Sequence, residues 1–519
     1  MDPVTTRRTF AIISHPDAGK TTLTEKLLAA AGAVRLAGQV RARGEGRRTR
    51  SDWMEMEQKR GISISSSVMT FEYRGLTFNL LDTPGHSDFS EDTYRTLTAV
   101  DSAIMVIDAA KGIESQTLKL FEVCRLRDIP IVTFVNKVDR EGLGPLAIID
   151  DIADKLALDV APVLWPLGDG VGFRGCLDLR TEKVVTANGT AAAGIDDADT
   201  LLEGGIVRDE ATYLQSLEQL ELARSALPEF DLETYRAGHL TPIFFGSALN
   251  DIGVVELLDA VAEWAPSPRP QPAEPAPIDP TDPETTGFVF KVQANMDPNH
   301  RDRVAFVRLS SGRFHRGDKL RNGRTGKDLA VANPMFFFAQ ERELAEEAVA
   351  GDVIGIPNHG TLSVGDTLTS GSARRVTGIP NFAPELIRRV RIPDALKAKQ
   401  LAKALSDLAE EGVAQVFRPN IGSDWLVGVV GPLQLDVLSS RLGAEYGVPV
   451  TFEDAGYQSA RWPVAKDEAE LKRFIAAQRS RLAEDRYGAA VFLVRDPWSF
   501  QVLQRDWPDI TFATTRERH

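Results

Sequence analysis

The stretch from Phe10 to Leu28, FAIISHPDAGKTTLTEKLL, constrains the fold of this chain more than any other. Its apolar run Phe10–Ile13 predicts a β-strand, a loop follows at 14–19, and leucines at helical spacing predict a helix from Lys20. A strand, a loop and a helix in this order cradle the phosphates of a nucleotide, because loop amides and the helix N-terminus favour negative charge. Lys20 can reach the outer phosphates, and the Thr21 hydroxyl suits Mg²⁺.

One position of this loop departs from the usual phosphate-loop pattern. Such a loop usually begins with glycine, and here Ser14 takes that place. Gly19 is present directly before the lysine, where the backbone has to approach a phosphate closely. Taken alone, the stretch also fits an ordinary glycine-containing loop before a helix, so the interpretation depends on motifs elsewhere in the chain.

A second motif follows a predicted strand at Leu76–Leu81, which runs into Asp82-Thr83-Pro84-Gly85-His86. An aspartate at the end of a strand suits Mg²⁺ binding through a water molecule. The N–H of Gly85 can hold a γ-phosphate, and His86 stands where a polar side chain can orient the attacking water. Together with the phosphate loop, this motif predicts a nucleoside triphosphatase.

A third motif, Asn136-Lys137-Val138-Asp139, follows the predicted strand Ile129–Val135 and specifies the base. Asp139 can accept hydrogen bonds from the N1–H and the exocyclic amine of guanine, a pair of donors that adenine lacks. Asn136 can tie this segment to the phosphate loop, and the stem of Lys137 can cover the ring. The sequence therefore predicts binding of GTP and GDP.

The base site is completed by a further strand, Pro242–Phe245, that ends in Gly246-Ser247-Ala248. A backbone amide of the Ser-Ala pair can donate to the guanine carbonyl. Strands and helices alternate through this part of the chain, which predicts a doubly wound parallel sheet with its ligand at the strand ends.

Composition restricts the class of protein further. The chain has 519 residues, enough for several domains, with 43% hydrophobic and 26% charged residues. A formal net charge of −14 argues against a protein that coats nucleic acid over its whole surface. The polar N-terminus, the lack of a long apolar run, and only two cysteines, Cys124 and Cys176, predict a cytoplasmic protein with reduced thiols and no membrane partner.

The chain is expected to be a multidomain α/β protein. Short strands separated by Gly-Asp turns predict a β-barrel after a proline-rich connector, which we interpret as a plain, extended tether. A mixed α+β domain follows, whose basic residues fit either a ribosomal contact or a solvated helix face. The predicted boundaries are a P-loop GTPase domain at 1–264 with an inserted subdomain at about 143–236, a linker at 265–286, a β-barrel domain at 287–373, and an α+β C-terminal domain at 374–519.

The nucleotide motifs resemble those of the translational GTPases, the superfamily of elongation factors Tu and G. The segments that carry this resemblance are 15–22 (HPDAGKTT), 60–64 (RGISI), 82–86 (DTPGH) and 136–139 (NKVD). Within the superfamily, the chain resembles the bacterial class II release factors. The stretches most similar to them are 51–65 (SDWMEMEQKRGISIS), 82–98 (DTPGHSDFSEDTYRTLT), 287–307 (GFVFKVQANMDPNHRDRVAFV) and 377–389 (TGIPNFAPELIRR).

The resemblance implies roles for individual residues. Ser63 lies where elongation factors carry a switch threonine that closes on Mg²⁺, and the basic loop 38–61 before it would be a nucleotide-sensing switch. Lys20 and His86 would act in catalysis, and Thr21, Ser63 and, through water, Asp82 would hold Mg²⁺. The expected GTP-binding residues are Ser14, His15, Pro16, Asp17, Ala18, Gly19, Lys20, Thr21, Thr22, Asp82, Gly85, His86, Asn136, Lys137, Asp139, Ser247 and Ala248.

The resemblance also implies a biological step, GTP-dependent dissociation of class I release factors from the ribosome after peptide release. The expected partners are the ribosome, through its RNA and proteins, and class I peptide release factors, and the expected state is a monomer. A translocase like elongation factor G is disfavoured by the length after the barrel, and a carrier of aminoacyl-tRNA like elongation factor Tu by the α/β pattern there. A GTP-binding regulator that does not hydrolyse GTP is disfavoured by His86.

Overall fold

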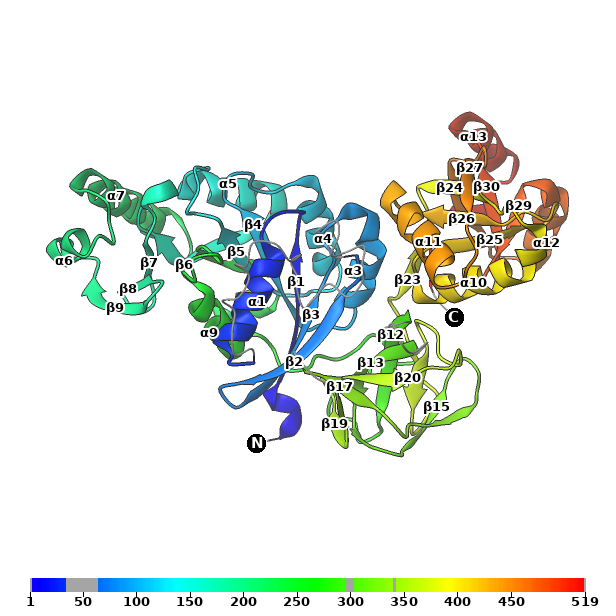
Figure 1. Cartoon of the computed structure of the whole chain (residues 1–519), viewed down its shortest axis with the longest axis horizontal. Helices are drawn as coiled ribbons and strands as arrows, with labels where there is room; N and C mark the ends of the chain where they lie inside the picture. Colours follow the sequence, from blue (N-terminus) through cyan, green and yellow to red (C-terminus); the bar gives the residue numbers. More distant parts are fainter. Residues whose placement is uncertain (1, 34–63, 295–302, 339–341, 518–519) are drawn as a thin grey trace.

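The computed structural model describes residues 2–33, 64–294, 303–338 and 342–517. The basic loop 38–61 and Ser63, which we assigned to Mg²⁺, lie outside the described residues. We call the chain before the proline-rich segment the nucleotide-binding domain, the strands after that segment the barrel domain, and the remainder the C-terminal domain. Figure 1 shows the barrel domain beside one end of the nucleotide-binding domain, and the C-terminal domain beside α3 (Ser90–Leu97).

One sheet of ten strands forms the core of the nucleotide-binding domain (Figure 1). In spatial order the strands are β2 (Ser67–Tyr73), β3 (Leu76–Asp82), β1 (Arg7–Ser14), β4 (Ser102–Asp108), β5 (Ile131–Asn136), β10 (Leu240–Phe245), β6 (Asp159–Pro166), β7 (Gly175–Asp178), β8 (Lys183–Thr186) and β9 (Gly189–Gly194). The six strands from β3 to β6 in this order run parallel, and the strands outside them are antiparallel. The predicted doubly wound sheet is therefore confirmed, with antiparallel edges.

Helices cover both faces of this sheet, which explains why its central strands are apolar on both sides. Phe10 to Ile13 in β1 are fully buried, and so are Met105 to Ile107 in β4. Within the described residues, the helices of the domain are η1 (Pro3–Thr6), α1 (Lys20–Ala30), η2 (Ser87–Phe89), α3, α4 (Ser115–Arg125), α5 (Pro145–Leu156), η3 (Gly170–Gly172), α6 (Ala198–Glu203), α7 (Glu210–Ala226), α8 (Leu232–Arg236) and α9 (Val254–Trp264).

The segment 143–236, which we predicted to be an inserted subdomain, continues the main sheet. Its first strand, β6, pairs in parallel with β10, and β7 to β9 extend the same sheet outward by antiparallel pairing. Helix α5 packs its apolar residues Ile148, Ile149 and Ile152 into the core of the domain. The outer part, β7 to β9 with α6 and α7, forms the projecting end of the domain in Figure 1.

The barrel domain consists of short antiparallel strands, as predicted. An eight-stranded sheet and a two-stranded sheet make up this domain. Their strands are β12 (Thr286–Ala294), β13 (Arg303–Ser311), β14 (Arg313–His315), β15 (Lys319–Asn322), β16 (Asp328–Ala330), β17 (Met335–Phe337), β18 (Arg342–Leu344), β19 (Glu347–Val349), β20 (Val353–Pro357) and β21 (Thr367–Thr369).

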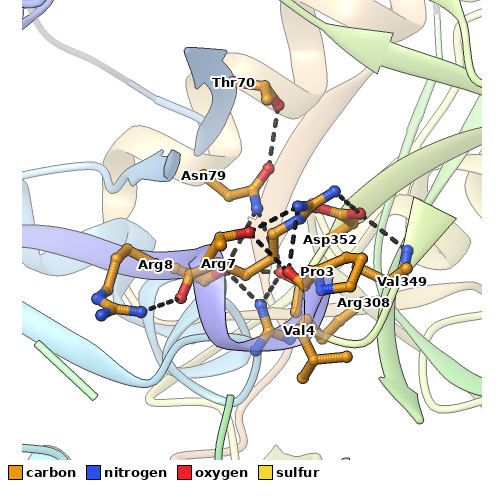
Figure 2. Close-up of polar contacts among 12 residues, drawn as sticks. Pro3, Val4, Arg7, Arg8, Thr70, Asn79, Arg308, Val349 and Asp352 are labelled. Carbon is orange, nitrogen blue, oxygen red and sulfur yellow. Dashed lines mark hydrogen bonds and ion pairs between the residues drawn. The ribbon is translucent and has the colours of Figure 1, made fainter. Parts of the chain in front are cut away.

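A buried polar cluster joins the barrel to β1 and β3 of the nucleotide-binding domain (Figure 2). Arg308 of β13 donates to the Asp101 carboxylate at 2.5 Å and to the Gly351 carbonyl. The side-chain amide of Asn79 in β3 donates to the same carbonyl at 3.2 Å, and Arg7 of β1 donates to Asp352 at 2.8 Å. Because the cluster is buried, loss of one partner would leave a polar group unsatisfied, and this fixes how the two domains join.

The proline-rich segment 265–286 is held in place along its length, so its interpretation as a plain tether is wrong. The backbone N–H of Arg269 donates to Asp101 at 3.0 Å, and its guanidinium donates to the carbonyl of Asp128 at 2.5 Å. Strand β11 (Ala273–Glu274) pairs with β22 (Arg375–Val376), and Ile278 is fully buried. Proline spacing predicts an extended backbone but carries no information on what that backbone contacts.

The C-terminal domain has the predicted α+β architecture, with helices against an eight-stranded sheet. In spatial order the sheet contains β27 (Thr451–Asp454), β24 (Leu386–Arg391), β26 (Leu426–Val429), β25 (Gln415–Pro419), β29 (Leu482–Asp485), β30 (Ala490–Val494), β28 (Ser459–Ala465) and β31 (Ile510–Ala513), and β23 (Pro380–Phe382) pairs with β32 (Thr515–Glu517). The helices are η4 (Ala395–Lys397), α10 (Ala398–Glu411), α11 (Pro432–Ala444), α12 (Glu468–Ala477), η5 (Arg479–Arg481) and α13 (Pro497–Asp506).

The basic residues of this domain were predicted to fit either a ribosomal contact or a solvated helix face. Arginines in the basic group have acidic neighbours. Arg391, for example, contacts Asp424 at 2.9 Å and Glu453 at 2.8 Å. In the part of the chain that the structure describes, no helix combines the length and apolar character needed to cross a membrane.

Candidate active site

The predicted motifs meet at one edge of the ten-stranded sheet. Ser14, Asp82, Asp108 and Asn136 are the last residues of β1, β3, β4 and β5. These strands are neighbours and run parallel, so their carboxyl ends lie at the same edge. The loops that carry the phosphate, catalytic and base motifs therefore converge there, at the place where open α/β sheets bind their ligands.

The phosphate loop presents free backbone donors at the start of α1. Gly19 is the N-cap of this helix and, as a glycine, has no side chain with which to cap it. Asp17 and Gly19 both have left-handed backbone conformations, with φ of +66° and +94°. Because the first N–H groups of a helix have no partner within the helix, amides at Lys20, Thr21 and Thr22 are placed to bind an anion. The loop therefore fits the phosphates of a nucleotide.

A glycine is also required at position 19 because the side chain of Asn136, from the base motif, lies against it. A Cβ atom built on Gly19 would lie 2.2 Å from Nδ2 of Asn136, far inside van der Waals contact. The glycine therefore permits two features at once, a left-handed backbone and close approach of the asparagine side chain. A sequence pattern alone indicates the first feature, and only the structure shows the second.

We expect Gly19→Ala to abolish tight binding of guanine nucleotide while the protein still folds. A matched control is Gly32→Ala at the other end of α1, where φ is +73° and a new Cβ would meet nothing within 4 Å. Both variants carry the left-handed strain of about 1–2 kcal/mol, but only Gly19→Ala displaces Asn136. Titration with a fluorescent GDP analogue should show a loss of at least about 100-fold for Gly19→Ala, because strain and displacement act together. Equal affinities for the two variants would contradict this account.

Lys20 and Asp82 form a buried ion pair between the phosphate and catalytic motifs. The Lys20 ammonium contacts the Asp82 carboxylate, and their side chains are 6% and 2% exposed. The pair places one cation and one carboxylate side by side where the outer phosphates and a metal ion are expected. A buried pair of this kind is destabilised strongly when one partner is removed, because the other charge stays buried.

Asn136 ties the base motif to the phosphate loop, as predicted, and also contacts the Ser-Ala loop. Its side-chain Nδ2 donates to the carbonyl of Ala18 at 2.8 Å, and its Oδ1 accepts from the N–H of Ala248 at 2.9 Å. The side chain is almost fully buried, so these two bonds fix the spacing of the loops that would bind phosphate and base.

Lys137 extends this bridge to β4. Its ammonium donates to the carbonyl of Asp17 and to the carboxylate of Asp108, the latter at 2.7 Å. Burial alone would raise the pKa of Asp108, but hydrogen bonds from Lys137 and from the N–H of Ala110 lower it below its usual value. Asp108 is therefore ionised at neutral pH. Asp108 was not among the predicted site residues, although its position at the end of a buried strand matches that of Asp82.

The catalytic motif lies against the phosphate loop. A Cβ built on Gly85 would be 3.8 Å from the His15 carbonyl oxygen and from the Cα of Pro16, which places this glycine beside the loop. The hydroxyl of Thr83 donates to the Ile12 carbonyl at 2.7 Å and holds the motif to β1. His86, with its side chain 32% exposed, caps η2 by accepting the N–H of Asp88 at Nδ1, at 3.2 Å.

The base motif ends in a side chain with free acceptor atoms. Asp139 is half-buried, and its carboxylate has no hydrogen bond or ion pair within the described ranges. Ser247 and Ala248 are fully buried at the end of β10, where the Ser247 N–H donates to the Ile252 carbonyl at 3.1 Å. The Ala248 N–H donates to Asn136, so both N–H groups of this pair have partners within the protein and order the loop, and their predicted donation to the guanine carbonyl stays a prediction.

His15 in the phosphate loop and the two cysteines of the chain are uncharged at neutral pH. Burial lowers the pKa of His15, opposed in part by Glu114, so His15 is neutral at pH 7 and adds no charge beside the phosphates. Cys124 and Cys176 are free and buried, and burial raises the pKa of the Cys124 thiol to about 12. Both cysteines are therefore unreactive core residues, as the composition predicted.

The structure thus places every described residue of the predicted nucleotide site at one edge of the sheet. Thr83 and Asp108 were not among the predicted site residues. The sequence does contain a signal for them, because each is a polar residue at or just after the end of a buried parallel strand. Ser63 lies outside the described residues, so its assignment stays a prediction.

Comparison with known proteins identifies the domains. Residues 5–267 match the elongation factor Tu GTP binding domain, residues 284–371 match elongation factor G domain 2, and residues 376–504 match "Class II release factor RF3, C-terminal domain". Peptide chain release factor 3 from Bordetella pertussis is 51% identical over 519 residues, which covers 99% of this chain and 97% of that protein. A crystal structure of a protein from Thermus thermophilus is 26% identical with a TM-score of 0.69, over 86% of this chain and 67% of that one.

These similarities and the geometry of the site agree. The domain matches follow the order of the domains along the chain, and the first match contains all the nucleotide motifs. The protein is a ribosome-dependent GTPase that binds guanine nucleotide and takes part in translation termination. The chain belongs to the peptide chain release factor 3 family of translational GTPases.

Proposed function

We propose that the protein hydrolyses GTP by positioning and electrostatic stabilisation, with Lys20 and His86 in the main roles. The amides at the start of α1 and the Lys20 ammonium would stabilise charge on the phosphates. His86 would orient the water that attacks the γ-phosphate. Asn136 and Lys137 would hold the base loop against the phosphate loop, and Asp139 would select guanine. The bridging hydrogen bonds of Asn136 and the Lys20–Asp82 pair support this arrangement.

We assign Mg²⁺ binding to Thr21 directly and to Asp82 through water. Thr21 is the second residue of α1 and is half-buried, and the Asp82 carboxylate is buried beside Lys20. These hard oxygen donors fit the preference of Mg²⁺. When bound, the ion would neutralise charge that develops between the outer phosphates.

We assign GTP hydrolysis to one step of termination, dissociation of class I release factors from the ribosome after peptide release. The observation that carries this assignment is the match of residues 376–504 to the class II release factor C-terminal domain, in a chain 51% identical over 519 residues to peptide chain release factor 3. A carrier of aminoacyl-tRNA would have a second barrel at this place, and the chain has an α+β domain there. We further propose that the protein is a cytoplasmic monomer with domains at 1–264, 287–373 and 374–519.

Dissociation of a labelled class I release factor from post-release ribosomes tests this step. With GTP, we expect the wild-type protein to accelerate dissociation at least about tenfold over the same protein with GDP, which corresponds to about 1.4 kcal/mol of barrier. His86→Ala with GTP should lose this acceleration while still binding GTP. Equal dissociation rates for wild type and a His86→Ala variant that no longer hydrolyses GTP would show that GTP hydrolysis does not drive the step.

A further inference from the structure

The turn that carries His86 is in direct contact with the C-terminal domain. Two residues after the histidine, the Oδ2 of Asp88 accepts the backbone N–H of Leu433 at 2.8 Å. Leu433 is the second residue of α11, and Pro432 before it has no N–H to offer. Asp88 therefore caps the N-terminus of a helix in another domain, where a carboxylate is favoured by both the free amide and the helix dipole.

The two domains approach so closely at this point that position 431, the N-cap of α11, has no room for a side chain. A Cβ built on Gly431, the N-cap of α11, would lie 2.0 Å from the Cγ of Asp88. The backbone of Gly431 is extended, with φ of −146° and ψ of 168°, which any residue can adopt. The glycine is therefore needed here for space and not for its backbone freedom.

Apolar contacts and a further hydrogen bond surround this polar contact. Phe89 packs with Ile64 of the nucleotide-binding domain and Val437 of α11 in one small buried cluster. The Phe89 ring also lies edge-on to the His86 ring, with centroids 6.3 Å apart. Near the cluster, the side-chain amide of Gln415 donates to Glu91 of α3 at 2.8 Å. Figure 1 shows α11 next to α3 across the boundary between the domains.

The second oxygen of Asp88 faces the histidine. Its Oδ1 lies 3.3 Å from Nδ1 of His86, and the backbone nitrogen of Asp88 lies 3.2 Å from the same ring nitrogen. Nδ1 donates to the carboxylate when it carries a proton and accepts the backbone N–H when it does not, so Asp88 is its partner in both forms of the ring. The Asp88 side chain is 9% exposed and the His86 side chain 32% exposed. Asp88 is therefore the more buried of the two residues, is held by the N–H of Leu433, and contacts the imidazole at Nδ1.

We infer that Asp88 is a positioning residue for His86, and that α11 of the C-terminal domain holds Asp88 in place. The inference rests on the proposed role of His86 in hydrolysis. In this inference, the Asp88 carboxylate connects two features: the docking of the C-terminal domain and the orientation of the His86 side chain. Movement of α11 away from the turn releases Asp88 and, with it, the imidazole.

The test compares two glycine-to-alanine variants in the same helix. Gly431→Ala places a methyl group against Asp88, whereas a Cβ on Gly443 would meet nothing within 4 Å. At saturating ribosomes, we expect Gly431→Ala to lower kcat for GTP hydrolysis about tenfold, with unchanged affinity for GDP and unchanged half-stimulating ribosome concentration, and Gly443→Ala to behave as wild type. An unchanged kcat for Gly431→Ala, or a change only in the half-stimulating ribosome concentration, overturns the inference.

Variants of Asp88 provide the second measurement. Asp88→Ala should lower kcat to the same extent, and Asp88→Asn should restore part of it because the amide oxygen still accepts the Leu433 N–H. Asp88→Ala and Gly431→Ala both remove the same contact, the one between Asp88 and the start of α11. The kcat of the double variant should therefore be no lower than that of either single variant. Additive losses in kcat would overturn the link between α11 and His86. His86→Ala separates the two proposals. Full activity of His86→Ala refutes the role of His86, whereas an inactive His86→Ala beside an unaffected Asp88→Ala refutes only the positioning role.

Discussion

Replacement of Asp139 by asparagine should change the preferred nucleotide from GTP to xanthosine triphosphate. The carboxylate can accept from both N1–H and the exocyclic amine of guanine, whereas an asparagine amide offers one acceptor and one donor. The amide therefore matches xanthine, which has a carbonyl at the position of that amine. A site built to bind a specific donor discriminates by roughly 10⁴–10⁵-fold against a ligand that lacks it, so we expect GTP affinity to fall by that order.

Competition between GTP and xanthosine triphosphate in an equilibrium binding assay measures this change. Asp251→Asn is a suitable control, because Asp251 lies in the loop after Ala248 and pairs with Lys26, and its left-handed backbone, φ +60°, tolerates asparagine. The control should keep the preference for GTP. If Asp139→Asn also keeps that preference, the base is recognised elsewhere and our assignment of the base site is wrong.

The convergence of the predicted site residues at one edge of the sheet has a simple physical origin. Ser14, Asp82 and Asn136 each follow a buried apolar run, and parallel strands bring their ends to one edge. The bridge from Asn136 to Ala18 and Ala248 follows from that convergence. Local pattern and global fold therefore agree here, and the motifs predict which edge of the sheet carries the candidate site.

Contacts between domains could not be predicted in this way. Asp88 and Leu433 are 345 residues apart, and Arg308 and Asp101 are 207 apart. Each residue taken alone has the sequence context of a surface turn or a barrel strand. Their pairing depends on how domains dock, which has no periodic signature in the sequence. For the same reason, the proline-rich segment was predicted to be extended but not to be held by Arg269 and β11.

Replacement of His86 by alanine should remove most of the ribosome-stimulated hydrolysis and leave nucleotide binding intact. His86 follows Gly85, which lies beside the phosphate loop, and its side chain is 32% exposed and contacts its own turn through Nδ1. Loss of a group that acts only in the transition state lowers kcat without weakening ground-state binding. We expect kcat to fall about 10²–10³-fold, in the range found when one preorganised polar group is removed.

Single-turnover GTP hydrolysis with saturating ribosomes, together with GDP titration, separates these quantities. His239→Ala removes an exposed histidine just before β10, at the opposite edge of the sheet, and should be fully active. His86→Gln should retain part of the rate, because a side-chain amide can still hydrogen-bond to water. A His86→Ala variant with wild-type kcat would show that another group orients the water. Asp88 lies in the same turn as His86 and contacts the start of α11. If Gly431→Ala reproduces part of the kcat loss seen in His86→Ala, the position of α11 contributes to the orientation of His86.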